Sequence, residues 1–161
     1  MVGYWVNENW RAMKDFALKL IEESNNLINR PDVIGQRIRI LHLDHANELL
    51  MKSWLIKNGY MISYLKESDL KNGVKQEKVL EMDRTMSYED CLNLVSKQLR
   101  LPTEKKEKIK SFHKLRNEIQ HRAINLYLDK TEMIENFYPI FRELYEKMYP
   151  DYNDFPYMAS A

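Results

Sequence analysis

Apolar side chains recur at helical spacing along most of the chain, and Pro, Gly and Asn residues interrupt the pattern. This pattern predicts four long helices and one short helix. Their expected ranges run from Asn7 or Asn9 to Asn29, from Asp32 to Lys57, from Ser87 to Leu99, from Thr103 to Leu128 and from Asp129 to Tyr149. Asp32, Ser87 and Asp129 suit the N-cap position, and Gly59 suits the end of the second long helix. We therefore expect an all-α fold, an antiparallel four-helix bundle with an additional short helix.

The second long helix carries apolar residues around much of its circumference, which predicts that it is the central and most buried one. Its polar residues are His42, Asp44, His45, Glu48 and Lys52. A buried carboxylate needs a basic partner, so we expect Glu48 to pair with Arg116 or Lys52. His42, His45 and Glu48 lie three residues apart, which leaves a divalent-metal site as an alternative, although no second motif adds ligands to it.

Two segments depart from the helical pattern. Residues 60–86 contain two short apolar runs around a polar stretch, which predicts an irregular or hairpin insertion between the second helix and the short helix. Residues 151–161 are rich in Tyr, Asp and Pro and lack periodicity. We therefore expect one helical domain over residues 1–150 and an extended C-terminal tail over 151–161.

Composition narrows the class of protein. With 161 residues, of which 44% are hydrophobic, the chain can bury the core of one domain. A net charge of +1 gives no general attraction to polyanions, so a site for RNA has to be a local patch. The single cysteine, Cys91, falls on the apolar face of the short helix and is expected to be a core thiol. No leader-like or membrane-spanning apolar run is present, and we expect a soluble, cytoplasmic protein without a membrane partner.

The helix expected over Thr103–Leu128 has two distinct faces. One is an apolar stripe that predicts a core contact, made of Ile109, Phe112, Leu115, Ile119, Ala123 and Leu126. The other combines imidazoles, amides and one aliphatic side chain, and its members are His113, Asn117, Gln120, His121 and Ile124. Since a solvated face usually consists of Lys and Glu, this second stripe is interpreted as a contact surface.

Arg116, Asn117 and His121 are the candidate chemical groups of that helix. Asn117 and His121 lie four residues apart on successive turns, so the amide can orient the imidazole. Arg116 lies about 140° around the axis from His121, which favours a ligand lying across the helix or a second chain facing it. The spacing alone favours a structural interpretation, in which Arg116 pairs with an acidic residue of the bundle such as Glu48 and His121 caps or packs.

The order Arg116, Asn117, three further residues and His121, late in an all-helical chain, resembles the motif of HEPN-domain ribonucleases. In that motif His follows Arg after four to six residues, and a polar residue often comes directly after the Arg. The run from His45 to Lys52 also resembles an earlier helix of that family, which carries a Glu-Leu pair followed by Lys. The resemblance covers roughly Ile34 to Tyr149.

The resemblance implies a metal-independent endoribonuclease that uses no cofactor and forms homodimers in which the motif helices face one another. Arg116 would bind phosphate, His121 would act as general base or acid, and Asn117 would orient His121 or the phosphate. The nearby side chains expected to contact the RNA substrate are His113, Lys114 and Gln120.

Many ribonucleases that share this motif are toxins of toxin–antitoxin or phage-defence systems, so an antitoxin protein is an implied partner. In one subgroup the antitoxin modifies a Tyr two residues after the motif His. That position is Ala123 here, so inactivation by this route is not expected. Two other classes stay open: a non-catalytic helical module that binds nucleotide or protein, and the metal-binding bundle described above.

Overall fold

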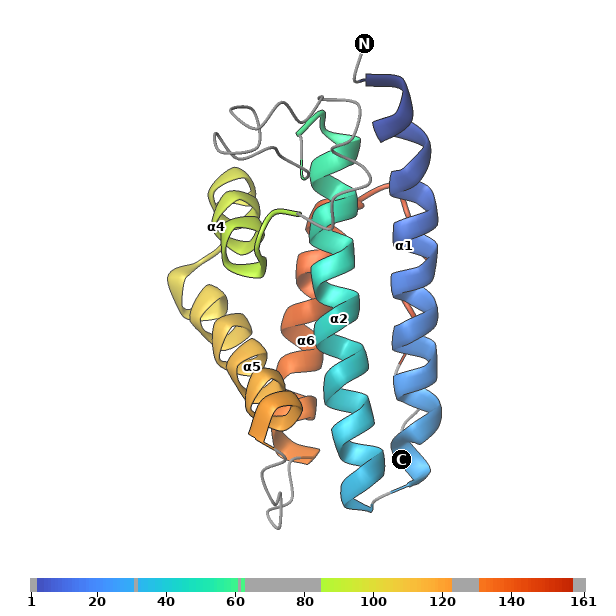
Figure 1. Cartoon of the computed structure of the whole chain (residues 1–161), viewed down its shortest axis with the longest axis vertical. Helices are drawn as coiled ribbons and strands as arrows, with labels where there is room; N and C mark the ends of the chain where they lie inside the picture. The colour runs from blue at the N-terminus through green and yellow to red at the C-terminus, as the bar shows by residue number, and fades with distance from the viewer. Residues whose placement is uncertain (1–2, 31, 61, 63–84, 123–130, 158–161) are drawn as a thin grey trace, which may run out of the picture.

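The computed structural model describes residues 3–30, 32–60, 62, 85–122 and 131–157, and the elements within these ranges are helical. They are α1 (Gly3–Asn26), a 3₁₀ turn (Leu27–Asn29), α2 (Val33–Lys57), α4 (Tyr88–Leu99), α5 (Thr103–Arg122) and α6 (Thr131–Met148). The all-α prediction is confirmed. The long helices α1, α2, α5 and α6 alternate in direction along the chain (Figure 1).

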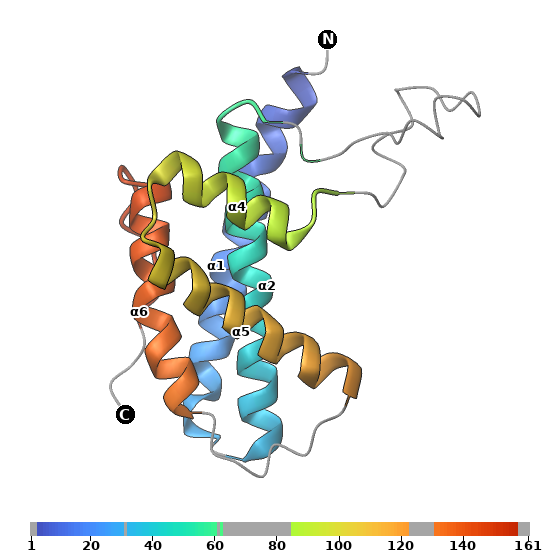
Figure 2. The same cartoon turned by 90° about the vertical axis from the view of Figure 1, so that its left-hand side faces the viewer.

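α2 lies at the centre of this arrangement. α1 and α6 run alongside it, whereas α4 and α5 cross it obliquely from one side (Figures 1 and 2). Its buried side chains include apolar groups on several faces, such as Ile40, Leu43, Leu50 and Leu55. The prediction that this helix is the most enclosed agrees with its position, because a helix apolar all round has to be covered on all sides.

Local sequence sets both ends of α2. The Asp32 carboxylate accepts a hydrogen bond from the backbone N–H of Gly35 at 2.8 Å, which caps the start of the helix as predicted. A Cβ atom at Gly35 would lie 2.5 Å from the Arg30 carbonyl oxygen, so the tight connection from α1 requires glycine here. Gly59, with φ of +83°, follows the C-cap and ends the helix.

The short helix α4 and the motif helix α5 dock through the faces that the sequence indicates. The Ser87 hydroxyl accepts from the backbone N–H of Asp90 at 3.1 Å and caps α4. On α5, Ile109, Phe112, Leu115 and Ile119 are buried. Phe112 stacks on Phe137 of α6 with ring centroids 3.8 Å apart, so the apolar stripe of α5 is a core face.

Some predictions differ from the structure or fall outside it. The first helix begins at Gly3 rather than after Asn7 or Asn9, so neither Asn is its N-cap. The hairpin or irregular insertion lies almost wholly outside the described residues, although its two ends meet where Met86 N–H donates to the Ile62 carbonyl. The continuation of α5 to Leu128 and the Asp129 cap also lie outside them.

The C-terminal segment packs back onto the bundle. Phe155 is buried and its ring contacts the rings of Tyr138, Phe141 and Tyr145 of α6. Asp154 pairs with Lys14 of α1. Residues 151–157 are non-helical, and the contacts of Asp154 and Phe155 attach this segment to the helical bundle.

No helix in the part of the chain that the structure describes is both long enough and apolar enough to cross a membrane.

Phe155 and Tyr157 provide a matched test of this packing. We expect Phe155→Ala to lower the free energy of unfolding by about 3 kcal/mol, because it removes a buried ring. Tyr157, which is 67% exposed, is the control, and Tyr157→Ala should cost well under about 1 kcal/mol. Urea unfolding followed by tryptophan fluorescence measures both values. Equal losses would show that the segment is not part of the core.

Candidate functional site

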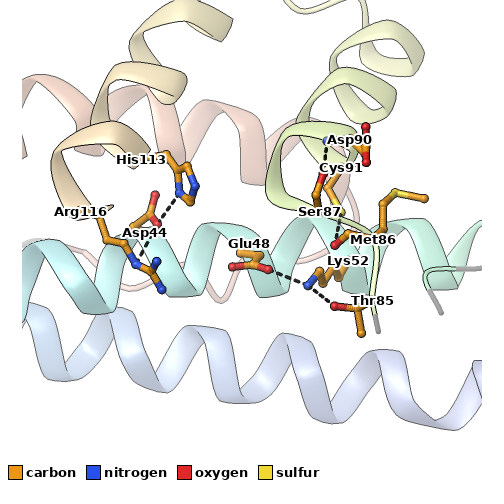
Figure 3. A network of polar contacts seen from close by, with 10 residues as sticks. All are labelled: Asp44, Glu48, Lys52, Thr85, Met86, Ser87, Asp90, Cys91, His113 and Arg116. Atoms are coloured by element: carbon orange, nitrogen blue, oxygen red, sulfur yellow. Dashed lines mark hydrogen bonds and ion pairs between the residues drawn. The ribbon is translucent and has the colours of Figure 1, made fainter. Parts of the chain in front are cut away.

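A carboxylate without solvent exposure lies on the central helix where α5 crosses it. Asp44 of α2 is 0% exposed, and both His113 and Arg116 of α5 approach it (Figure 3). The His113 Nδ1 atom lies 2.8 Å from Asp44 Oδ2, and the Arg116 Nε atom lies 3.6 Å from the same oxygen. The Arg116 contact is therefore an ion pair rather than a hydrogen bond, and it supplies the positive charge that a buried carboxylate needs.

Asn117 connects the two α5 side chains. Its amide oxygen accepts a hydrogen bond from Arg116 Nη1 at 2.8 Å, and its amide nitrogen lies 3.1 Å from His113 Nε2. The sequence predicted that Asn117 orients His121. In the structure its two polar atoms instead contact residues one and four positions earlier on the helix.

Tyr88 of α4 stacks on one face of the His113 ring. The two rings stack with centroids 3.6 Å apart and planes inclined by 11°. Asn47 of α2 donates to the Tyr88 hydroxyl oxygen at 2.7 Å. Burial, followed by the nearby Asp44 carboxylate, raises the pKa of Tyr88 well above its usual value, so the phenol stays protonated. Tyr88 thus covers one face of the His113 ring and is itself held from α2 by Asn47.

Arg116 keeps hydrogen-bonding capacity beyond these contacts. A guanidinium has five N–H donors, and one of them is used by Asn117. The Arg116 side chain is 23% exposed, and its Nε atom has no hydrogen-bond partner among the described residues. Nε is buried on the side of Asp44, so an anion from solvent can reach only the terminal Nη groups, of which Nη1 is oriented by Asn117.

The other predicted site residues lie farther out. His121 is exposed in the last turn of α5, as is Gln120 beside it. Lys114 is also exposed, whereas His113, predicted to contact substrate, is only 22% exposed and is bound to Asp44. Among the described residues, Lys114, Gln120 and His121 have no hydrogen-bond or ion-pair partner. Ile124 lies outside the described residues.

Glu48 does not pair with Arg116. Its carboxylate binds Lys52 one turn later at 2.6 Å, and Lys52 also donates to Thr85 at 2.9 Å (Figure 3). Glu48 therefore has a basic partner, as expected, and this partner is Lys52 rather than Arg116. The reason is geometric, because residues four apart stack on one face of a helix.

The three residues of the alternative metal site, His42, His45 and Glu48, do not form a ligand cluster in the structure. His45 is exposed and meets the Phe16 ring edge-on, while Glu48 is bound to Lys52. No group of three or more His, Cys, Asp or Glu side chains suited to a metal ion occurs within the described ranges.

The lysines at the start of α5 are largely paired with acidic residues. Lys108 binds Glu104 at 2.8 Å, and Lys110 reaches Glu89 of α4 at 2.7 Å. Lys105 pairs with Glu143 of α6. These pairs cancel much of the local positive charge, so the start of α5 is not a free basic patch.

Sequence reasoning missed the role of Asp44. Buried positions on one face of α2 follow the order Ile40, Asp44, Asn47, Met51, which is the spacing of a core stripe. Two polar residues at successive positions of such a stripe signal a buried polar cluster. Tyr88 gave no comparable signal, because a Tyr in an apolar stripe is usually a core residue.

The geometry defines a helical bundle with a buried polar cluster, formed by Asp44, Asn47, Tyr88, His113, Arg116 and Asn117. The chain belongs to the family described as "Domain of unknown function (DUF3644)", whose model matches residues 29–156. The match includes all of α2, α4, α5 and α6 and therefore every residue of the polar cluster. No curated protein and no solved structure matches the chain.

Cys91 provides a test of burial beside this cluster. Burial raises the pKa of its thiol from 9.0 to about 11, so the nucleophilic thiolate is scarce near neutrality. We expect a disulfide reagent at about pH 8 to leave the folded protein unmodified and to label one thiol after guanidinium unfolding. Absorbance of the released thiol measures both reactions. Rapid labelling of the folded protein would show that Cys91 is accessible.

Proposed function

We propose that this protein is a metal-independent endoribonuclease of the HEPN type that acts on RNA in the cytoplasm as a toxin or phage-defence nuclease. One observation carries the proposal: Arg116 is held beside a buried carboxylate, while His121 is exposed five residues later on the same helix. The same two residues form the Arg-Asn-x-x-x-His motif that resembles the HEPN signature.

These two side chains have the chemistry that RNA cleavage needs. A neutral His121 imidazole takes the proton from a ribose 2′-hydroxyl, whose oxygen then attacks the adjacent phosphorus. Arg116 stabilises the negative charge on the non-bridging oxygens as the bond to the 5′-oxygen breaks. The products are a 2′,3′-cyclic phosphate and a 5′-hydroxyl; the proton that His121 accepts passes to solvent, and the leaving 5′-oxygen takes a proton from water.

The ion pair between Arg116 and Asp44 also favours a second candidate, a non-catalytic helical module that binds nucleotide or a partner protein. In that case the Arg116 charge serves to compensate Asp44. Arg116→Ala would then change stability without changing any reaction on RNA.

The first test of the ribonuclease is cleavage in EDTA. We expect purified protein to cut single-stranded RNA without added metal, because the proposed chemistry uses side chains alone. Arg116→Ala and His121→Ala should each lower the rate about a hundredfold or more. Gel electrophoresis of end-labelled RNA measures the rate. Arg100→Ala, an exposed Arg outside the proposed site, is the control and should cleave like the wild type.

Activity only with added divalent metal would contradict the mechanism. Activity that survives both Arg116→Ala and His121→Ala would contradict the residue assignment.

We also propose a homodimer built through the second, mixed polar stripe of α5, which carries Gln120 and His121. Gln120 and His121 are exposed, and the 140° between Arg116 and His121 keeps one chain from directing both groups to one side. A two-fold axis at this stripe brings Arg116 of one chain towards His121 of the other, giving two composite sites in one cleft.

Two like charges placed on either side of the two-fold axis test this arrangement. We expect Gln120→Arg to shift the protein from dimer to monomer in light scattering, because the two new charges face each other. Gln98→Arg makes the same change at an exposed position of α4 and should leave a dimer. A monomeric wild type at micromolar concentration would contradict the proposal.

Mixed dimers give a functional readout of the same geometry. Co-expressed, differently tagged Arg116→Ala and His121→Ala chains form heterodimers in which one composite site is intact and the other lacks both groups. Purified heterodimers should regain up to about half of the wild-type activity, while each mutant homodimer stays nearly inactive. Absence of any recovery would argue against composite sites.

A further inference from the structure

Asp44 and three side chains of α5 form a closed ring of polar contacts. Arg116 Nη1 donates to Asn117 Oδ1, and the Asn117 amide nitrogen contacts His113 Nε2. His113 Nδ1 contacts Asp44 Oδ2, and this same oxygen forms the ion pair with Arg116 that closes the ring. We name these four residues, Asp44, His113, Arg116 and Asn117, the Asp44 ring.

The order of donors and acceptors in the ring is fixed. Arg116 can only donate, so the Asn117 oxygen must face it and the Asn117 NH₂ group must face His113. His113 Nε2 is then an acceptor, and Nδ1 carries the proton that is donated to Asp44. The ring contacts thus assign a donor and an acceptor to each of its hydrogen bonds, with Arg116 donating to Asn117, Asn117 donating to His113 and His113 donating to Asp44.

The ring is also held mechanically. Asp44 is 0% exposed on the central helix and cannot turn towards solvent. His113 is stacked on Tyr88, whose hydroxyl is held by Asn47, so its ring plane is fixed from α2 and α4. The Arg116 side chain is 23% exposed, and of its terminal Nη groups the one contact to a described residue is that of Nη1 with Asn117, so these groups are the ones that a ligand can reach.

We propose that Asp44, His113 and Asn117 are positioning residues that fix the orientation of the Arg116 guanidinium towards an RNA phosphate. This inference rests on the ribonuclease proposed above and assigns roles to residues outside its Arg–His pair. His113 is a link in the ring and does not exchange protons with RNA. Asn117 orients Arg116 instead of His121.

The ring predicts non-additive effects on cleavage. Asp44→Asn keeps the shape of the side chain and an acceptor for His113 but removes the charge that holds Arg116. We expect it to lower the single-turnover cleavage rate about tenfold to a hundredfold in EDTA, because a misplaced donor loses transition-state contact. In an Arg116→Ala background the same substitution should change the remaining rate less than about twofold, because its effect acts through Arg116.

A pair of substitutions at His113 separates positioning from proton transfer. The amide of His113→Gln offers one donor and one acceptor and can bridge Asp44 and Asn117, whereas His113→Leu fills the space beside Tyr88 with neither. We expect Gln to retain at least about five times more activity than Leu, and the difference to vanish with Arg116→Ala. Equal losses for Gln and Leu would overturn the positioning role.

Asp154→Asn is the matched control, since it removes an ion-paired carboxylate that binds Lys14 and Tyr145 away from the ring. It should leave the cleavage rate unchanged. Circular dichroism and thermal unfolding check that each variant folds. If Asp44→Asn does not fold, the comparison of His113→Gln with His113→Leu tests the positioning role, because the His113 side chain is partly exposed.

The outcomes separate this inference from the proposed function. If Arg116→Ala and His121→Ala abolish cleavage but Asp44→Asn and His113→Leu do not slow it, the ring role is overturned and the ribonuclease stands. If the double variant loses cleavage rate by the product of the two single losses, Asp44→Asn acts independently of Arg116→Ala, and the ring role is overturned as well. If Arg116→Ala and His121→Ala both cleave like the wild type, the proposed function and the ring role fail together.

Discussion

The charge on Asp44 is the constraint on which the arrangement of this protein depends. A carboxylate with 0% exposure on the central helix costs several kcal/mol in lost hydration unless other groups compensate it. The compensation comes from α5, which supplies a cation and an imidazole within one turn of each other, at Arg116 and His113. The crossing of α5 over α2 is therefore set by a polar contact as well as by the apolar stripe that packs against α6.

The same constraint accounts for the position of α4. Both ring nitrogens of His113 are engaged in polar contacts, and the Tyr88 ring stacks on the face of the imidazole and holds its plane. The Tyr88 hydroxyl is in turn anchored to α2 through Asn47. The short helix α4, the motif helix α5 and the central helix α2 thus share one polar cluster, which includes Arg116.

Much of the bundle could be predicted from the sequence because its helices have local signals. The caps at Asp32 and Ser87 and the apolar stripe of α5 depend on residues within a few positions of one another. The site was less accessible, because Asp44 and His113 lie 69 positions apart and periodicity gives no pairing between helices. Glu48 illustrates the difference, since its local partner Lys52 could be named from spacing whereas the distant partner of Arg116 could not.

α5 is divided between two environments, and this division gives the Arg–His spacing its meaning. At Arg116 the helix is tied to the core through Asp44, while at His121, five residues later, it is exposed. An arginine fixed in this way can present a guanidinium at the protein surface without losing side-chain entropy when it binds an anion. Within the described residues, no hydrogen bond or ion pair engages the ring nitrogens of His121. A purely structural Arg116 explains the first half of this arrangement, whereas the composite site proposed above, which takes Arg116 from one chain and His121 from its partner, uses both halves.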